Sequence, residues 1–182
     1  MATVTIQSNE VCGKEGKMAD SVWPVLLVAA CLGALTGLRA FTPIAVLAWM
    51  LHLHHLRILG SPLYFLHTMP AVIILTVLAA AELIADKLPF TPSRLRLPGL
   101  VGRVIFGAVC GVVSGQMWGA SWQTSLTAGL VGALIGAVAG YEIRKGWVET
   151  LHWHDLPVAL IEDVVAIGGS IWVVSRAFLL AY

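Results

Sequence analysis

Five apolar stretches, each long enough to cross a lipid bilayer, constrain this chain more than any other feature of its sequence. A membrane-spanning helix needs about 20 mostly apolar residues. Because backbone groups in lipid must find hydrogen-bond partners within the protein, we expect helices over all of these stretches. The sequence therefore predicts an all-α integral membrane protein, a bundle of about five transmembrane helices. The stretches cover residues 23–51, about 63–86, about 98–117, about 124–143 and about 156–180.

The composition agrees with lipid as the surrounding solvent. Of the 182 residues, 58% are hydrophobic and 12% are charged, and the mean hydropathy is +0.87. Soluble domains average about 45–50% apolar and about 25% charged residues, so a soluble fold of this length could not bury so much apolar surface. The three cysteines form no close pair, which predicts neither a disulfide framework nor a thiolate metal site.

Several motifs of soluble enzymes and nucleic-acid-binding proteins are absent from the sequence. It has no phosphate-binding glycine loop, no nucleophile elbow and no HExxH zinc motif. A glycine run inside an apolar span is not a nucleotide site. We therefore expect no cofactor and no nucleic-acid partner, and we favour a protein that is not an enzyme.

Charge divides the chain into a tail and a membrane domain, and it also predicts an orientation. Residues 1–22 are polar, and the apolar run after them exceeds the core of about 7–15 residues that a signal peptide has. We expect a mobile tail at 1–22 and one transmembrane domain at 23–182.

Five crossings would place the tail and the loops 87–103 and 142–155 on one side. Positively charged loops stay in the cytoplasm, so we predict a cytoplasmic N-terminus and an external C-terminus. That side would hold Lys14, Lys17, Lys87, Arg94, Arg96, Arg103, Arg144 and Lys145, and the other Arg57 and Arg176.

Glycines recur at a spacing of four residues in three apolar runs, at 33–37, 107–115 and 132–140. Such glycine-rich faces let helix backbones approach closely in lipid. We expect them to pack helices within one bundle, and an interface between copies of a homo-oligomer is the alternative. GALTGLRA at 33–40 also resembles GALIGAVA at 132–139. If the first helix ran outward and the fourth inward, this similarity would make a weak inverted repeat, as in many transporters.

Acidic residues inside the apolar runs are the first candidates for a functional site, because each costs about 2.5–3.5 kcal/mol to insert. Glu82 and Asp86 are four residues apart on one helix face, and Glu162 and Asp163 lie at a similar predicted depth. Glu142, at the end of the fourth run, could join them. We predict an inner-leaflet cluster that binds a cation or relays protons. The alternative is structural ion pairing with nearby cations, namely Lys87, Arg94, Arg103 and Arg144.

Arg39 lies within the first apolar run, four residues before Pro43. Counted from Trp23 at 1.5 Å per residue, it lies about 24 Å along the helix, in the outer half of the membrane. Pro43 can kink the helix and free backbone carbonyls around Arg39, and charged, broken helices form sites in transporters. Arg39 would then gate or balance the acidic cluster. The alternative is a side chain that extends to the outer surface.

Histidines gather beside two of the apolar runs and are the candidate metal ligands of the chain. His52, His54 and His55 follow the first run, and His152 and His154 precede the fifth. Imidazole nitrogens suit zinc or a similar ion. Neither group has the spacing of a known zinc motif, so we favour histidines that are solvated at the membrane interface.

The proline-rich loop at 87–98 carries a basic cluster that continues into the next run. Its arginines are Arg94 and Arg96, and Arg103 lies just beyond them. Positive clusters at a cytoplasmic interface attract anionic lipid headgroups. These arginines could hold the phosphate of a lipid, or they could serve only to fix the topology.

Three stretches together carry a resemblance to a known family: GLRAFTPIAVLAW at 37–49, ELIADKLPFTPSR at 82–94 and PVALIEDVVAIG at 157–168. Over roughly residues 24–176, the chain resembles a family of small bacterial multi-pass membrane proteins that is catalogued as a domain of unknown function. The resemblance implies a compact multi-helix protein of the bacterial inner membrane. It implies no activity and supplies no catalytic residues.

Three functions are compatible with these features. We expect first a small transporter or channel-like protein, in a homo-oligomer, for a cation or a proton-coupled small solute. The second is a protein or membrane enzyme that handles a phosphorylated lipid, and the third is a non-catalytic subunit or scaffold of a membrane complex. The lipid bilayer is the predicted partner in all three, with an ion or an anionic lipid as a further ligand.

Overall fold

The described part of the chain is built from helices and contains no strands. The computed structural model describes residues 23–54, 62–86, 97–117, 120–151 and 155–181, which form six α-helices and one 3-10 helix. A first helix over Trp23–Leu38 is followed by α2 (Thr42–Leu53), the 3-10 helix η1 (Pro62–His67), α3 (Met69–Ala85), α4 (Leu97–Met117), α5 (Trp122–Leu151) and α6 (Asp155–Ala181).

Three of these helices are long and apolar enough to cross a membrane. They lie within α4, α5 and α6, over Gly99–Met117, Trp122–Trp147 and Pro157–Ala177. Helix α3 has 17 residues, the lower limit of the range of about 17–25 residues for a spanning helix. Large apolar side chains such as Ile73 and Trp172 are exposed on the bundle surface. Exposed apolar surface of this extent marks contact with lipid or protein, and with the long helices it indicates a membrane protein.

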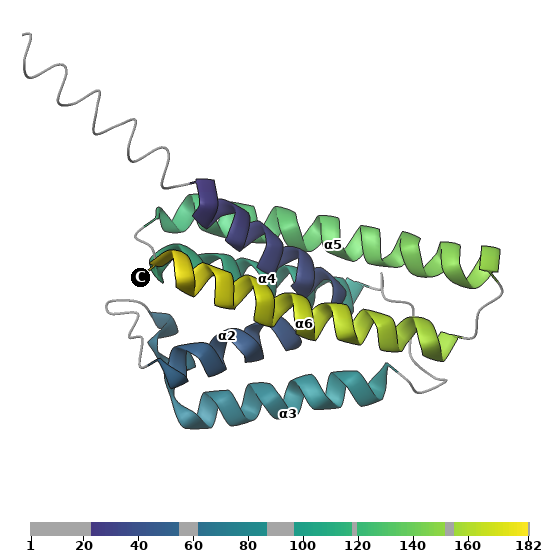
Figure 1. The fold of residues 1–182 in the computed structure, drawn as a ribbon, viewed down its shortest axis with the longest axis horizontal. Helices are drawn as coiled ribbons and strands as arrows, with labels where there is room; N and C mark the ends of the chain where they lie inside the picture. The colour runs from purple at the N-terminus through teal and green to yellow at the C-terminus, as the bar shows by residue number, and fades with distance from the viewer. Residues whose placement is uncertain (1–22, 55–61, 87–96, 118–119, 152–154, 182) are drawn as a thin grey trace, which may run out of the picture.

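Helices α3 to α6 run alternately between two ends of the molecule (Figure 1). Helices α3 and α5 begin at one end, which we call the base end, and finish at the opposite end, which we call the loop end. Helices α4 and α6 run from the loop end back to the base end. This alternation of neighbouring helices is the up-down arrangement that short connections produce in helical bundles.

The predicted first span, 23–51, is a helical hairpin in the structure and not one crossing helix. The first helix ends at Leu38, the chain turns back over residues 39–41, and α2 returns to the base end (Figure 1). Pro43 lies in the first turn of α2, where its missing N–H has no intrahelical partner to lose. At 1.5 Å per residue the two arms are about 24 and 18 Å long, short of the bilayer core of about 30 Å.

Contacts along the two arms establish the reversal. Gly132 and Gly136 of α5 lie against the backbone carbonyl groups of Ala30 and Ala34, so the first arm runs parallel to α5. Hydrogen bonds at both ends of α2 show that α2 runs antiparallel to α3. Since α3 and α5 run in the same direction (Figure 1), the two arms are antiparallel. The prediction of a continuous first span was wrong, because a reversal within the membrane leaves the apolar pattern unbroken.

The reversal changes where the ends of the membrane domain lie. The start of the first helix and the end of α6 both lie at the base end (Figure 1). The prediction of opposite sides assumed that residues 23–51 cross the membrane once, and it does not hold for residues 23–181. The ends of α3 and α5 and the starts of α4 and α6 share the loop end, which agrees with the prediction that residues 87–103 and 142–155 lie on one side.

The glycine-rich faces form a seam inside the bundle. Gly129 of α5 lies against the backbone of Gly107 and Gly111 in α4, and the first arm approaches it at Gly33. This confirms the prediction that the glycine-rich faces pack helices within one chain. The homo-oligomer stays a prediction, because the packing of these glycines is explained without a second copy. The similar stretches 33–40 and 132–139 run parallel, so the prediction of an inverted repeat was wrong.

Candidate functional site

Arg39 lies at the turn of the hairpin and is fully buried, at 0% exposure. Its Nη1 donates a hydrogen bond of 2.6 Å to Oδ2 of Asp86, at the end of α3. Its Nη2 donates to Oδ1 of Asp163 in α6. Hydrogen bonds between ionised partners are roughly twice as strong as neutral ones. One guanidinium therefore connects the hairpin turn to two helices that run the length of the bundle.

Glu82 holds the backbone on the other side of the turn. Its Oε1 accepts a hydrogen bond of 2.8 Å from the backbone N–H of Ala40, and its Oε2 accepts one of 3.0 Å from Phe41. The first N–H groups of a helix lack intrahelical partners and carry partial positive charge. Phe41, the residue at the N-cap position of α2, has no side-chain cap of its own. The cap is therefore supplied by a carboxylate from α3.

We call Arg39, Glu82, Asp86 and Asp163 the hairpin-turn cluster. The side chains of Asp86 and Asp163 are 13% and 9% exposed. Two buried polar atoms beside the cluster, Nε of Arg39 and Oγ1 of Thr42, have no hydrogen-bond partner among the described residues. Buried polar groups are nearly always hydrogen-bonded. These two atoms therefore offer a donor and a hydroxyl to a water molecule or ligand at the turn.

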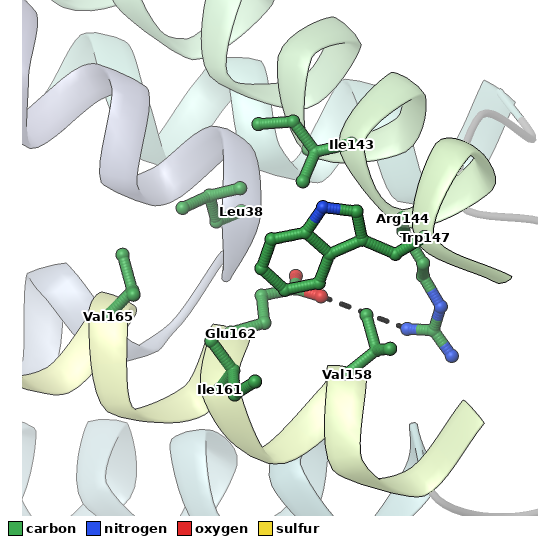
Figure 2. A pocket seen from close by; sticks show the side chains of 9 residues that line it. Leu38, Ile143, Arg144, Trp147, Val158, Ile161, Glu162 and Val165 are labelled. Atoms are coloured by element: carbon green, nitrogen blue, oxygen red, sulfur yellow. Dashed lines mark ion pairs between the residues drawn. The ribbon is translucent and has the colours of Figure 1, made fainter. Parts of the chain in front are cut away.

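Glu162 lies outside the cluster although it is next to Asp163 in sequence. Consecutive residues of a helix face in different directions, and Glu162 points toward α5. Its Oε2 lies 3.8 Å from Nη1 of Arg144. Both residues line a pocket of about 220 Å³ together with Trp147 (Figure 2). Glu142, the last carboxylate of the predicted cluster, is exposed on α5 and lines neither site.

The cluster thus joins three predicted carboxylates to an arginine that the sequence placed elsewhere. Arg39 was expected in the outer half of the membrane, away from the acidic residues. It lies beside Asp86 because the first arm starts at the base end and runs in the same direction as α3, so that both helices end near each other. Full burial excludes the alternative of a side chain that extends to the surface.

The predicted headgroup and metal residues are not gathered into sites in the described part of the chain. Arg103 is 7% exposed in α4 and forms no open cationic surface. Nδ1 of His52 lies 2.8 Å from the backbone oxygen of His67, and His54 is exposed. No group of three potential metal-ligating side chains occurs in the described ranges. Outside them lie the predicted residues Arg94, Arg96, His55, His152 and His154.

Sequence reasoning missed Thr42 and the pocket residue Trp147. The Thr-Pro pair at 42–43 is a recognisable helix-start signal, since proline favours the first helical turn. It could have suggested a new helix at this point. Nothing local could have identified the pocket, because Leu38 of the first arm is far in sequence from the residues of α5 and α6 that form its other walls.

Comparison with known proteins places the chain in one family. No curated protein and no solved structure matches it. A family described as a domain of unknown function, DUF4126, matches residues 26–181. The match covers the cluster, the pocket and all but the first three residues of the hairpin, and it confirms the resemblance to a family catalogued as a domain of unknown function. The chain is therefore a member of the DUF4126 family.

Proposed function

We propose that this protein is a small proton-coupled transporter or channel of the bacterial inner membrane, with the hairpin-turn cluster as its site. The observation that carries the proposal is the buried Arg39, held at the turn of an interrupted helix by carboxylates of two other helices. Broken helices with charged groups are a common way to build transporter sites. Intramembrane ionisable residues are functional candidates by default, because they are costly to keep.

Protonation offers a way for such a site to move. A proton on Asp163 removes the negative charge that opposes Arg39 and leaves a weaker, neutral hydrogen-bond acceptor. In a low-dielectric interior this loss is large, since breaking a buried ion pair costs about 3–5 kcal/mol. Glu82 holds the backbone of the turn separately. Protonation could therefore release the guanidinium toward a solute while the turn keeps its position.

Positive charge favours the loop end as the cytoplasmic side in this proposal. The segment between α3 and α4 contains Lys87, Arg94 and Arg96, and α5 carries Arg144 and Lys145 toward its end. On the other side of the comparison, the tail before Trp23, the stretch between α2 and η1, and the end of α6 contain fewer cations in total, namely Lys14, Lys17, Arg57 and Arg176. By the positive-inside rule, Trp23 and the end of α6 then face the outside.

Proton flux into proteoliposomes tests the proposal. Purified protein is reconstituted with the pH dye pyranine inside the vesicles, and a potassium gradient with valinomycin drives proton movement. We expect flux above that of protein-free vesicles, and a loss of at least about tenfold in Asp163→Asn, which corresponds to about 1.4 kcal/mol. Glu142→Gln is the matched control, because it removes an exposed carboxylate outside both sites.

Two results would contradict the proposal. The first is flux in folded Asp163→Asn protein equal to that of wild type. The second is no flux above protein-free vesicles under any imposed gradient of protons, sodium or potassium. The second result would favour the scaffold alternative, in which the cluster only holds the hairpin in place.

A further inference from the structure

Two hydrogen-bonding atoms at the hairpin turn take no part in the ion pairs of the hairpin-turn cluster. Arg39 donates from Nη1 to Asp86 and from Nη2 to Asp163, but its Nε has no partner among the described residues. Oγ1 of Thr42, three residues further on, has none there either. Arg39 is 0% and Thr42 is 4% exposed, so bulk water reaches neither side chain. Buried polar groups are nearly always hydrogen-bonded, so these two atoms indicate a molecule bound at the turn.

The start of α2 adds a backbone acceptor to the same turn. Pro43, four residues after Arg39, has no N–H. In an uninterrupted helix, the residue at this position donates its N–H to the carbonyl oxygen of Arg39. The carbonyl therefore loses its helical donor where the chain turns. Residues 39–42 thus carry an N–H donor, a hydroxyl and a carbonyl acceptor within one turn.

The neighbouring groups restrict the bound molecule to an uncharged one. An anion would meet the carboxylates of Asp86 and Asp163, which already hold both Nη groups of Arg39. A bare cation would meet Nε–H, which is a donor and offers no lone pair. The guanidinium itself takes the position of a cation between the two aspartates.

The turn is also enclosed, which favours the smallest ligand. Ala40, Pro43 and Ile44 are buried together with Arg39 and Thr42. A buried water molecule typically makes about three hydrogen bonds to polar groups that lack other partners. The donor, the hydroxyl and the carbonyl at this turn match that requirement.

We propose that the hairpin turn binds one water molecule, which accepts a hydrogen bond from Nε of Arg39 and donates one to Oγ1 of Thr42. The ligand class is a neutral molecule that both accepts and donates hydrogen bonds. Thr42 is the residue that holds the water in place, because its hydroxyl is the only side-chain group of this site outside the ion network. The binding does not depend on the proposed transport function.

A second part of the proposal rests on the proposed function: this water delivers the proton to Asp163. The N–H bonds of a guanidinium lie in one plane, so a water on Nε and the Asp163 carboxylate on Nη2 share that plane. A proton that reaches the water forms hydronium. The hydronium gives its proton to the carboxylate, which becomes a neutral carboxyl group, and water remains. Thr42 is then a positioning residue, since it acts on the proton only through the water.

Solid-state NMR of the full-length protein in lipid bilayers tests the binding. With arginine labelled by nitrogen-15, the Nε signal of Arg39 is identified by its loss in Arg39→Lys. We expect magnetisation transfer from water protons to this Nε in wild type. The transfer should be lost in Thr42→Val, which has no hydroxyl, and kept in Thr42→Ser. Thr36→Val is the matched control, because Thr36 is also buried and its hydroxyl already donates a hydrogen bond of 2.6 Å to the backbone oxygen of Gly33.

Thermal unfolding in detergent provides a second test with an unambiguous sign. Removing a buried hydroxyl that has no partner relieves a desolvation penalty and should raise the melting temperature. Removing a hydroxyl that holds a water should lower it, because buried waters are costly to remove. We expect a lower melting temperature for Thr42→Val. The binding is overturned by a raised melting temperature in this variant, or by the absence of water transfer to Arg39 in wild type.

Proton flux in proteoliposomes tests the second part of the proposal. We expect lower flux in Thr42→Val than in wild type, and rescue by Thr42→Ser. Equal flux in folded Thr42→Val and wild type would overturn the role of the water in proton delivery. Absence of flux in wild type would instead contradict the transport function, and it is distinguishable because water binding is measured without flux.

Discussion

At the scale of single residues, the buried charge of Arg39 requires compensating partners in the interior of the molecule. An arginine cannot lose its proton in a protein, so burying it fully requires partners that compensate for lost hydration. Asp86 and Asp163 provide them from helices on either side of the hairpin turn. The sequence identified all of these residues as unusual, but it could not pair them. The Arg39–Asp163 contact joins residues 124 positions apart, and only the folded arrangement of helices determines it.

Removing Arg39 alone should lower the stability of the protein more than removing Arg39 together with the charges of its two aspartates. Arg39→Met leaves two buried carboxylates without their shared partner, which typically costs about 3–5 kcal/mol. The triple variant Arg39→Met, Asp86→Asn, Asp163→Asn has no buried charge left in the network and should recover most of that stability. Thermal unfolding in detergent, followed by circular dichroism, provides the comparison. A triple variant no more stable than the single one would show that the ion pairs are not what Arg39 contributes.

Glu82 should matter to the start of α2 more than to the bundle. Glu82→Ala removes the acceptor for two backbone N–H groups, and the loss of a helix cap costs about 0.5–2 kcal/mol. Glu82→Gln keeps an acceptor oxygen and should lose less. Hydrogen exchange read by mass spectrometry over residues 40–45 measures the effect directly. Equal protection of these amides in wild type and Glu82→Ala would contradict the capping role.

At the scale of elements, α5 is the helix against which the first arm and α4 pack most closely. Its small residues allow the first arm and α4 to approach backbone to backbone on different faces, at positions such as Gly136 and Gly129. The glycine spacing predicted this kind of packing from sequence alone. It could not predict that the first arm runs parallel to α5, because a small-residue face accepts a neighbour in either direction.

A pair of alanine substitutions in α5 separates this packing from helix propensity. Gly136→Ala would place a methyl group against the carbonyl of Ala34, and we expect a loss of about 1–3 kcal/mol from overpacking. Gly146→Ala, in the same helix, meets nothing within 4 Å. It should be neutral or stabilising by up to about 1 kcal/mol, because alanine favours helix. Similar melting temperatures for the two variants would mean that the seam is not tightly packed.

At the scale of the whole molecule, the pattern of apolar runs predicted a membrane-type helical domain and where its polar groups would gather. The pattern failed at residues 39–41, where apolar residues on both sides of a reversal look the same as one long span. That single error placed Arg39 away from the carboxylates that it pairs with, and it exchanged the predicted side of one end of the domain. The positive charge between the helices remained informative about orientation, because α3 and α5 end on the same side of the bundle, as the sequence predicted.

Labelling of single cysteines in intact bacteria tests the arrangement of the ends. With Cys12, Cys31 and Cys110 replaced by serine, Trp23→Cys and Ser121→Cys should both react with a membrane-impermeant maleimide from outside. Lys145→Cys should react only after the cells are permeabilised, because the loop end is proposed to be cytoplasmic. Reaction of Trp23→Cys and Ser121→Cys from opposite sides would contradict the hairpin, since the first helix and α5 both begin at the base end.

The return of both hairpin arms to the base end has a consequence for biogenesis. Arg39 lies at the turn between the two arms, and its buried charge needs its carboxylate partners to be stable. Its partner Asp163 is synthesised 124 residues later. The turn can therefore be secured only after α6 has been made, so the first segment of this domain to leave the ribosome is among the last to reach its final contacts.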